Sequence, residues 1–273
     1  MSEIEVKIVA DSIINGDRLT TFQLKFHRYI LAEFNTHRVF SRNASSSRAI
    51  PVKTMLKQIW NDPAMPIQFG SNKSGMQSGE ELSGFNKSAA RLLWKTAGKV
   101  ACVFAYGMMK VGLHKQWVNR VTEPWQFIHV IVSSTEWDNF FNLRCHPDAQ
   151  PEIHELARQM KLEYITYTPN TLNFGEYHLP YISKEEYDTF DEETLKKIST
   201  SRCCRVSYLK HDGSAPSVEE DMKLYERLVG SIPIHASPAE HPAMAIGDGK
   251  FYANFKGWKQ HRSEIETFNL EVR

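Results

Sequence analysis

The chain has 273 residues and a mass of 31.5 kDa, with 41% hydrophobic and 24% charged residues. This composition is ordinary for a soluble globular protein, and it excludes intrinsic disorder, a collagen-like repeat or a coiled coil as the main structure. Thirty-three Lys and Arg residues against 32 Asp and Glu leave a formal charge of +1. So small a surplus argues against a protein that coats nucleic acid, and we expect no nucleic-acid partner.

Membrane segments and a disulfide framework are not predicted either. The longest apolar run, residues 127–132, contains His129 and falls far short of the roughly 20 residues of a membrane helix. The N-terminus lacks the basic and then apolar pattern of a secretion signal. The adjacent pair Cys203-Cys204 has no metal-ligand spacing. We expect a cytoplasmic protein with no membrane partner, no metal site and a single domain over residues 1–273.

Two strand-like segments open the chain. Residues 6–14 form the first, and residues 19–26 alternate apolar and polar positions in the second. Asn15-Gly16-Asp17 between them is a hairpin-turn signal. A short helix is predicted over 28–34, and a polar segment over 35–48 follows it.

Helical patterns dominate the remainder. Residues 63–86 are rich in Gly, Ser, Asn and Pro and predict a mobile excursion or lid, and residues 86–109 predict a long helix. Asp148 is predicted to cap a later helix. Residues 217–220 and 237–240 predict two further capped helix starts, and the second would offer an anion site. Without alternating βαβ units the fold class is α+β, with helices packed on an antiparallel sheet.

Common catalytic motifs are absent. There is no Gly-x-Gly-x-x-Gly after a strand, and the run Gly70 to Gly75 is not followed by the Lys-Ser of a Walker loop. Neither Gly-x-Ser-x-Gly nor His-Glu-x-x-His occurs. A usual dinucleotide-binding fold is therefore not predicted.

The segment Thr36 to Arg48 concentrates groups that bind anions. It holds three arginines, one histidine and four serines in thirteen residues. Arginine forks and serine hydroxyls can surround a phosphate from several directions. From composition alone, the alternative interpretation is a solvated Ser/Arg loop or a kinase target.

A second cluster runs from Asn119-Arg120 to Gln150 and contains Arg144 among aromatic residues. An arginine in that setting can stack on rings while it holds a carboxylate, a phosphate or a planar carbonyl. The alternative is a buried Arg144 paired with Asp138 or Asp148. Asn139 lies five positions before Arg144, so the two share a helical face only if the helix bends or ends near Leu143.

A third cluster comprises residues 203–208 and 235–241. By themselves these segments predict the end of a helix or strand and a capped helix start. His235 and His241 lie six positions apart, which is not a metal-ligand spacing.

Together the three clusters resemble the flavin-dependent thymidylate synthases. The family signature is Arg-His-Arg, seven residues and then Ser, commonly continued to an arginine. Here Thr36-His37-Arg38 is followed by seven residues, Ser46 and then Arg48. Further matches to family motifs are Arg120 to Pro124 (Arg-x-x-x-Pro), Asn139 to Arg144 (Asn-Phe-x-x-Leu-Arg) and Ala149 to Ile153 (Ala-Gln-x-Glu-Ile).

The order of the motifs resembles a circular permutation of that family. Segments like Arg205-Val-Ser207 and His235 to His241 precede the Arg-His-Arg motif in most members, whereas here they follow it. A permutation is tolerated when the original termini lie close together at the surface. Residues 260–262 compete with 36–38 for the Arg-His-Arg position, and the continuation into Ser46 favours the earlier segment. The resemblance covers about residues 18–50, 112–162 and 200–262.

Three positions depart from the family pattern. Thr36 replaces the first arginine, Ala49 a tyrosine, and Thr135 an arginine that usually helps to hold the flavin. Residues that could supply the missing charge are Arg42 and either Gln260 or Arg262.

The resemblance implies transfer of a one-carbon unit from methylenetetrahydrofolate to C5 of dUMP, with FAD reduced by NADPH, in a homotetramer whose sites are shared between subunits. It implies that Arg144 is the catalytic residue and stabilises charge that develops on the uracil ring. The implied dUMP-binding residues are Glu33, Ser46, Ser47, Arg48, Arg120 and Arg144. The implied FAD-binding residues are Thr36, His37, Arg38, Asn43, Asn139, Ser207, Ser237, Glu240, Gln260 and Arg262.

Three alternatives stay open. Cys145-His146 could provide a cysteine nucleophile, as in the other thymidylate synthase family. A related flavin enzyme could make a modified pyrimidine nucleotide, for example by hydroxymethylation. The departures at Thr36 and Thr135 leave room for a protein that binds nucleotide or nucleic acid without turnover.

Overall fold

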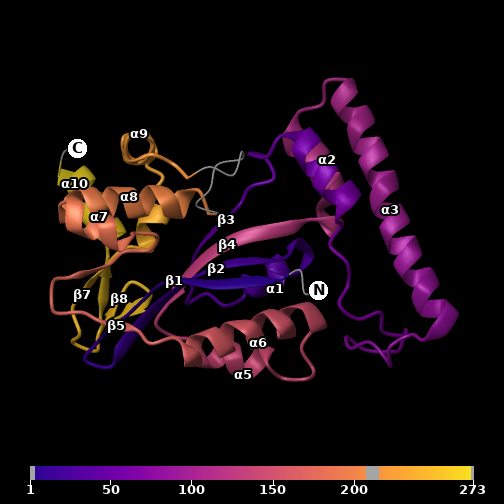
Figure 1. Cartoon of the computed structure of the whole chain (residues 1–273), viewed down its shortest axis with the longest axis horizontal. Helices are drawn as coiled ribbons and strands as arrows, with labels where there is room; N and C mark the ends of the chain where they lie inside the picture. Colours follow the sequence, from indigo (N-terminus) through magenta and orange to yellow (C-terminus); the bar gives the residue numbers. More distant parts are fainter. Residues whose placement is uncertain (1–3, 207–214, 272–273) are drawn as a thin grey trace.

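A computed structural model describes residues 4–206 and 215–271 (Figure 1). Its largest sheet has the strand order β3-β4-β2-β1-β5. Neighbouring strands are antiparallel except β1 and β5, which pair in parallel over two residues. The strands of this sheet are β1 (Glu5–Ile14), β2 (Asp17–His27), β3 (Ser41–Ala44), β4 (Phe127–Ser134) and β5 (Asn170–Thr171).

The predicted hairpin is confirmed. Asn15 and Gly16 join β1 to β2 with φ values of 49° and 89°, the left-handed pair that a two-residue turn between twisted strands requires. Strands β2 and β4 then place Phe22, Leu24 and Phe26 opposite Val132, Val130 and Ile128. These side chains form one face of the sheet, and they are fully buried.

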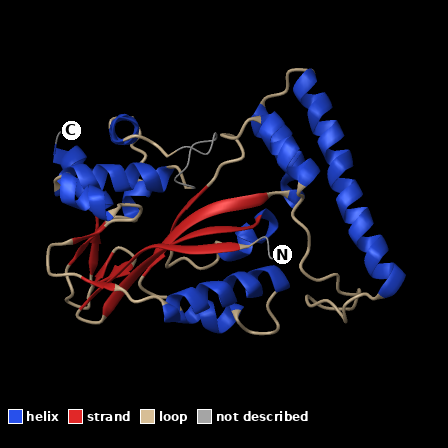
Figure 2. Cartoon of the chain, viewed as in Figure 1, coloured by secondary structure: helices blue, strands red, loops and turns tan. Residues whose placement is uncertain are grey.

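Helices cover that apolar face (Figure 2). They are the single-turn η1 (Arg28–Ile30) and α1 (Leu31–Phe34), and then α5 (Asp138–Arg144) and α6 (Pro151–Thr166). The apolar face of α6 supplies Ile153, Leu156 and Met160 to the core. The predicted cap at Asp148 is wrong: α6 begins at Pro151, because proline with its fixed φ suits the first helical position, and the capping residue is Gln150.

A second group of helices stands beyond one end of the sheet (Figure 2). It comprises α2 (Val52–Asn61), α3 (Gly84–Lys110), α4 (Lys115–Val118) and η2 (Asn119–Trp125). The long helix predicted over 86–109 is confirmed as α3. Gly98 lets α3 approach η2 closely, since a Cβ there would lie 2.9 Å from Cδ1 of Trp125. Residues 62–83, all of which the structure describes, form the predicted excursion, with one isolated bridge between Gly70 and Glu81.

The C-terminal part of the chain packs at the other end of the sheet. Its strands are β6 (Tyr177–His178), β7 (Ala243–Ala245), β8 (Phe251–Tyr252), β9 (Phe255–Lys256) and β10 (Trp258–Gln260). Its helices are α7 (Lys184–Thr189), α8 (Glu192–Cys204), α9 (Val218–Val229), η3 (Ser237–Glu240) and α10 (His261–Glu271). These elements, with the sheet and helices above, confirm the α+β class.

The two predicted capped starts in this part differ in outcome. Ser217 forms the expected capping box with Glu220 at the start of α9, which ends at Gly230. Ser237 does not cap a helix, because η3 is a single 3-10 turn whose capping residue is Ala236, and the Ser237 hydroxyl faces Asn43 instead. The predicted cap at Ser237 is therefore wrong. The anion site at this turn stays a prediction.

The tip of the first hairpin is joined to the C-terminal strands. Trp258 Nε1 donates to the carbonyl of Asp17 over 3.2 Å, and Asn15 Nδ2 donates to the carbonyl of Gly247 over 3.0 Å. Gly257 has a φ of 74°, and a Cβ there would lie 2.3 Å from Oδ2 of Asp17. Only a residue without a side chain fits this contact.

Among the described residues, no helix has the length and apolar character needed to cross a bilayer.

Candidate functional site

Arg144 lies at the end of α5 and turns toward the residues that follow α1. Its Nε donates to Nε2 of His37 over 3.0 Å, and Nη2 donates to Oγ1 of Thr36 over 3.4 Å. Its Nη1 forms an ion pair with Oε1 of Glu33. The structure therefore brings together four predicted site residues. The alternative pairing of Arg144 with Asp138 or Asp148 is wrong.

His37 is buried between aromatic rings. It stacks on Phe40 at a centroid distance of 5.7 Å and meets the edge of Phe140 at 4.9 Å. Burial, with the positive charges of Arg144 and Arg42, lowers the pKa of His37 from 6.5 to about 4. The ring is neutral at pH 7, and because its Nε2 accepts from Arg144, the proton resides on Nδ1.

Asn139 does not join this group. Helix α5 continues to Arg144, so the two positions differ by about 140° around the helix axis at about 100° per residue. Asn139 is exposed.

Arg42 connects this group to a second one at the start of β3. Its Nη1 donates to the carbonyl of His37 over 2.7 Å, and the charge of Glu240 acts on its guanidinium. The neighbouring Asn43 amide lies 3.2 Å from Oγ of Ser237 and 3.1 Å from Nε2 of His241. Segments 194 positions apart therefore meet at Asn43 and Ser237.

The residues of the competing segment 260–262 lie beside the same strand. Gln260 Nε2 donates to Oγ of Ser41 over 3.0 Å. Arg262 Nη1 lies 2.5 Å from Oε1 of Glu240. Gln260 thus contacts the start of β3, three residues after Arg38, and Arg262 is held by a carboxylate. Thr135, at the third departure from the family pattern, accepts a hydrogen bond from the backbone N–H of Lys256 over 3.0 Å.

The predicted phosphate-binding residues form a third group at the far end of β3. Asn119 Nδ2 donates to the carbonyls of Ser47 and Ile50, over 2.7 and 3.0 Å, and so ties the turn after β3 to η2. Ser46 and Arg48 are exposed on this turn, and Arg120 is exposed 3.6 Å from Glu123. The residues that Arg144 contacts precede β3, whereas Ser46, Ser47 and Arg48 follow it.

Besides Asn139, two predicted residues lie outside these groups. Arg38 is exposed in the turn between α1 and β3. Ser207 lies outside the described residues.

A buried chain of polar side chains leads away from Asn43, and the sequence analysis missed it. His241 Nδ1 lies 2.8 Å from Oγ of Ser133, which lies 2.6 Å from Oγ1 of Thr21. Thr21 lies 2.8 Å from Nε2 of His178, whose Nδ1 lies 2.9 Å from Oγ of Ser12. Burial lowers the pKa of both histidines from 6.5 to about 3, so both are neutral. The available signal was a pair of adjacent hydroxyl residues in each of two strands, Thr20-Thr21 in β2 and Ser133-Ser134 in β4.

Cys145 is a poor nucleophile in this setting. Burial raises the pKa of its thiol despite the charges of Lys161 and Arg158. A thiol that stays protonated attacks slowly. In the described residues, no three or more His, Cys, Asp or Glu side chains form a group that could hold a metal ion.

Comparison with known proteins gives weak likenesses only. No protein-family model matches the sequence, and no curated protein matches it. Among solved structures, the chain is similar to the UMP/dUMP methylase PolB from Streptomyces cacaoi bound with 5-Br UMP, at 14% identity and a TM-score of 0.49. The likeness covers 61% of this chain and 90% of that one. The same methylase bound with 5-Br dUMP matches at 14% identity and a TM-score of 0.48, over 61% and 91% of the two chains. At these values neither likeness decides fold or function.

Proposed function

We propose that this chain is a flavin-dependent thymidylate synthase that converts dUMP to dTMP, with methylenetetrahydrofolate as carbon donor and NADPH-reduced FAD as hydride source. The contact between Arg144 and His37 supports the proposal most directly. These residues belong to the two strongest motif matches, 107 positions apart, and their side chains meet. A chance pair of motifs has no reason to converge in this way.

Arg144 would act on the uracil ring. Its guanidinium is held in one orientation by His37 and Glu33 and stays partly exposed. A fixed, positively charged fork can bind a pyrimidine carbonyl and stabilise negative charge that develops on the ring during transfer. Because the neutral His37 accepts the Nε proton, both terminal amino groups of the guanidinium keep hydrogens to donate.

The phosphate of dUMP would bind at Ser46, Ser47, Arg48 and Arg120. These residues follow β3, whereas the residues that Arg144 contacts precede it, and this arrangement is compatible with a site that combines groups of two subunits. We therefore propose a homotetramer with shared sites. Exposed arginines and a short serine turn suit a phosphate because both offer donors without a competing carboxylate close by, apart from Glu123 at 3.6 Å from Arg120.

The groups around the start of β3 fit FAD by their chemistry. Arg42 and Asn43 lie next to Ser237, and Arg38 is exposed nearby in sequence. Cationic and hydroxyl groups of this kind suit a cofactor with two phosphates and a polar ring edge. FAD when bound would supply the hydride chemistry, while these residues would bind and orient it. The meeting of Asn43 with Ser237 is consistent with a circularly permuted member of the family.

The decisive experiment is anaerobic incubation of the protein with FAD, NADPH, methylenetetrahydrofolate and dUMP, followed by mass spectrometry of the nucleotide. We expect dTMP. A hydroxymethylated nucleotide would show the related flavin enzyme instead. A protein that binds no flavin yet retains nucleotide or DNA affinity would contradict the proposal and favour a binding protein.

A further inference from the structure

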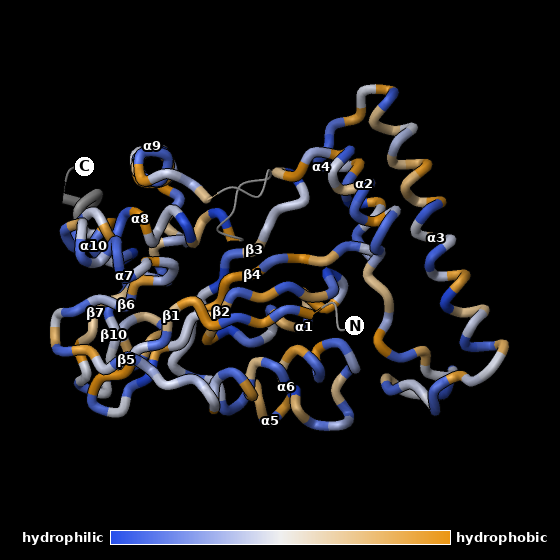
Figure 3. Tube along the Cα trace, in the orientation of Figure 1, coloured by the Kyte–Doolittle hydropathy of each residue, from blue (hydrophilic) through white to orange (hydrophobic). Residues whose placement is uncertain are grey.

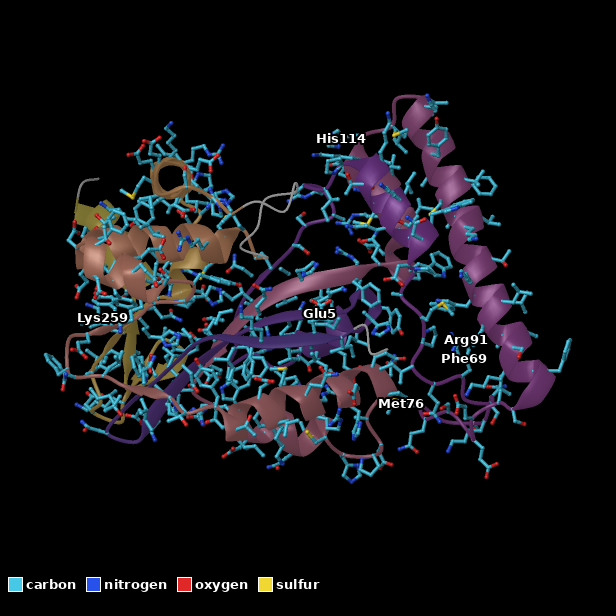
Figure 4. All side chains as sticks on the ribbon, in the orientation of Figure 1. Glu5, Phe69, Met76, Arg91, His114 and Lys259 are labelled. Carbon is cyan, nitrogen blue, oxygen red and sulfur yellow. The ribbon has the colours of Figure 1, made fainter. Side chains whose placement is uncertain are left out.

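Helix α3 carries an apolar face that nothing in the described chain covers. Its other side packs on α2 and η2 through Gly98, Cys102 and Ala105, which are buried. On the outer side the exposed fractions are 69% for Leu93, 49% for Val100, 63% for Phe104 and 84% for Val111. Figure 3 shows hydrophobic stretches along α3, and Figure 4 shows side chains that project from it away from α2.

The spacing of this outer face is that of a helix-packing seam. Counting from Leu93, the positions alternate steps of four and three residues. The seam residues are Leu93, Ala97, Val100, Phe104, Gly107 and, just after the helix, Val111. Such a repeat keeps one stripe facing a partner helix, whereas an apolar face that meets a flat surface has no need of it. The seam therefore fits a helix.

The seam is complementary to itself when reversed. An antiparallel pair of α3 helices centred on residue 102 places Leu93 opposite Val111 and Val100 opposite Phe104. Ala97 then lies opposite Gly107, so the two smallest residues of the seam meet where the helices must approach closely. A partner with an unrelated sequence would have no reason to produce this palindromic order of sizes.

Gly107 supports the same conclusion. A Cβ added to it would meet nothing within 4 Å, so no contact inside the chain requires a glycine there. A glycine inside a helix costs about 1 kcal/mol relative to alanine. Close approach of a second helix would explain that cost.

The size and charge of the face are compatible with a second copy. A helix of 27 residues is about 40 Å long, and beside it an apolar groove of about 310 Å³ between α2 and α3 adds Trp60 and Tyr106. Lys87, Arg91 and Lys95 lie on the other side of α3 from the seam. Lys99 and Lys110 at its edge lie over the rings of Trp60 and Tyr106.

We propose that the α3 seam binds the α3 seam of a second copy of this chain in antiparallel orientation, with Val100 of one copy against Phe104 of the other. Helices α2 and α3 lie outside the ranges that resemble the thymidylate synthases. A failure of this interface is distinguishable from a failure of the proposed function, because the Gly107→Arg mass and the cross-link register test the seam, whereas dTMP formation tests the function.

The test compares two arginines added to the same helix. Gly107→Arg places a long side chain on the seam at a position open enough to fold, and Ser88→Arg adds the same side chain at an exposed position off the seam. In sedimentation of the full chain we expect wild type and Ser88→Arg to form a dimer or larger assembly. Gly107→Arg should halve the mass, with at least a tenfold weaker association. Its thermal unfolding should show an intact fold.

A cross-link tests the register. An equimolar mixture of Val100→Cys and Phe104→Cys chains, distinguished by size tags, should form the mixed disulfide above the background of the native cysteines. A mixture of Val100→Cys and Leu93→Cys should not. A monomeric wild type, an unchanged mass for Gly107→Arg, or a preferred cross-link in the second mixture would overturn the proposal. A monomer would point instead to a helix of another protein.

Discussion

Arg144 and His37 share one hydrogen bond of 3.0 Å, from guanidinium Nε to imidazole Nε2. The bond requires a neutral imidazole, and burial between aromatic rings enforces that state. Each residue thus fixes the other: the ring orients the guanidinium, and the guanidinium discourages protonation of the ring.

Replacing Arg144 by Gln should raise the pKa of His37 above its value of about 4, because one of the two positive charges that lower it is removed. The pKa should remain below 6.5, since burial is the larger cause and persists. The measurement is an NMR titration of the histidine ring resonances. Arg158→Gln on the exposed surface of α6 is the control and should leave His37 unchanged; an identical titration in both variants would contradict the role of Arg144.

Arg144→Ala should lower kcat/KM for dTMP formation by about 10²–10³-fold or more, as expected when a fixed donor to developing charge is lost. Arg144→Lys should recover only part of the rate, because an ammonium keeps the charge but not the planar fork. Flavin absorbance after gel filtration with FAD should persist in both. Full activity in Arg144→Ala would refute the assignment.

The free energy of unfolding should fall as the pH drops below about 6.5. His178 and His241 have folded pKa values of about 3, so between these limits the unfolded chain binds more protons and stability decreases with falling pH. Each histidine contributes a slope of about 1.4 kcal/mol per pH unit. Urea unfolding at several pH values measures it.

Carboxylates also lower stability in acid, but over a lower pH range. Burial opposes the shift, yet hydrogen bonds from His261 and Tyr177 lower the pKa of Glu264 to about 2, so Glu264 affects the free energy of unfolding only below about pH 4.5. His241→Gln should be less stable than wild type near neutral pH. Between about pH 4.5 and 6.5, its free energy of unfolding should change less steeply with pH, by the roughly 1.4 kcal/mol per pH unit that one histidine contributes. A slope equal to that of wild type would argue against a neutral, buried His241.

Cys145→Ala should retain dTMP synthesis within about threefold of wild type, since burial raises the pKa of the thiol and the proposed chemistry does not use it. Alkylation of Cys145 near neutral pH should also be slow, as followed by mass spectrometry. Loss of activity in Cys145→Ala together with a trapped covalent nucleotide would favour the cysteine-dependent family.

Local signals in the sequence predicted local structure well. Asn15-Gly16 specified the first hairpin, and Ser217 with Glu220 specified the start of α9, because each device acts within four residues. The prediction at Asp148 is wrong because the helix begins at Pro151, and the residue before that proline is the cap. Ser237 failed because a distant partner, Asn43, competes for its hydroxyl.

Long-range pairings were predicted only where motifs supplied them. The family resemblance predicted the residues around Arg144. The alternative carboxylate partners, Asp138 and Asp148, are close in sequence, whereas the actual partner, Glu33, lies 111 positions away. The chain from His241 to Ser12 crosses several strands, and nothing within one segment indicates which hydroxyl will face which ring.

The bond between Trp258 and Asp17 spans 241 positions, and it bears on how the protein is made. During synthesis the hairpin of β1 and β2 leaves the ribosome long before the strands that cover its tip. Contacts between such remote segments form slowly, because a large loop must close first. The tip of the first hairpin therefore stays uncovered until the C-terminal segment has been synthesised. A nascent chain that stalls before that point would be prone to aggregation or proteolysis.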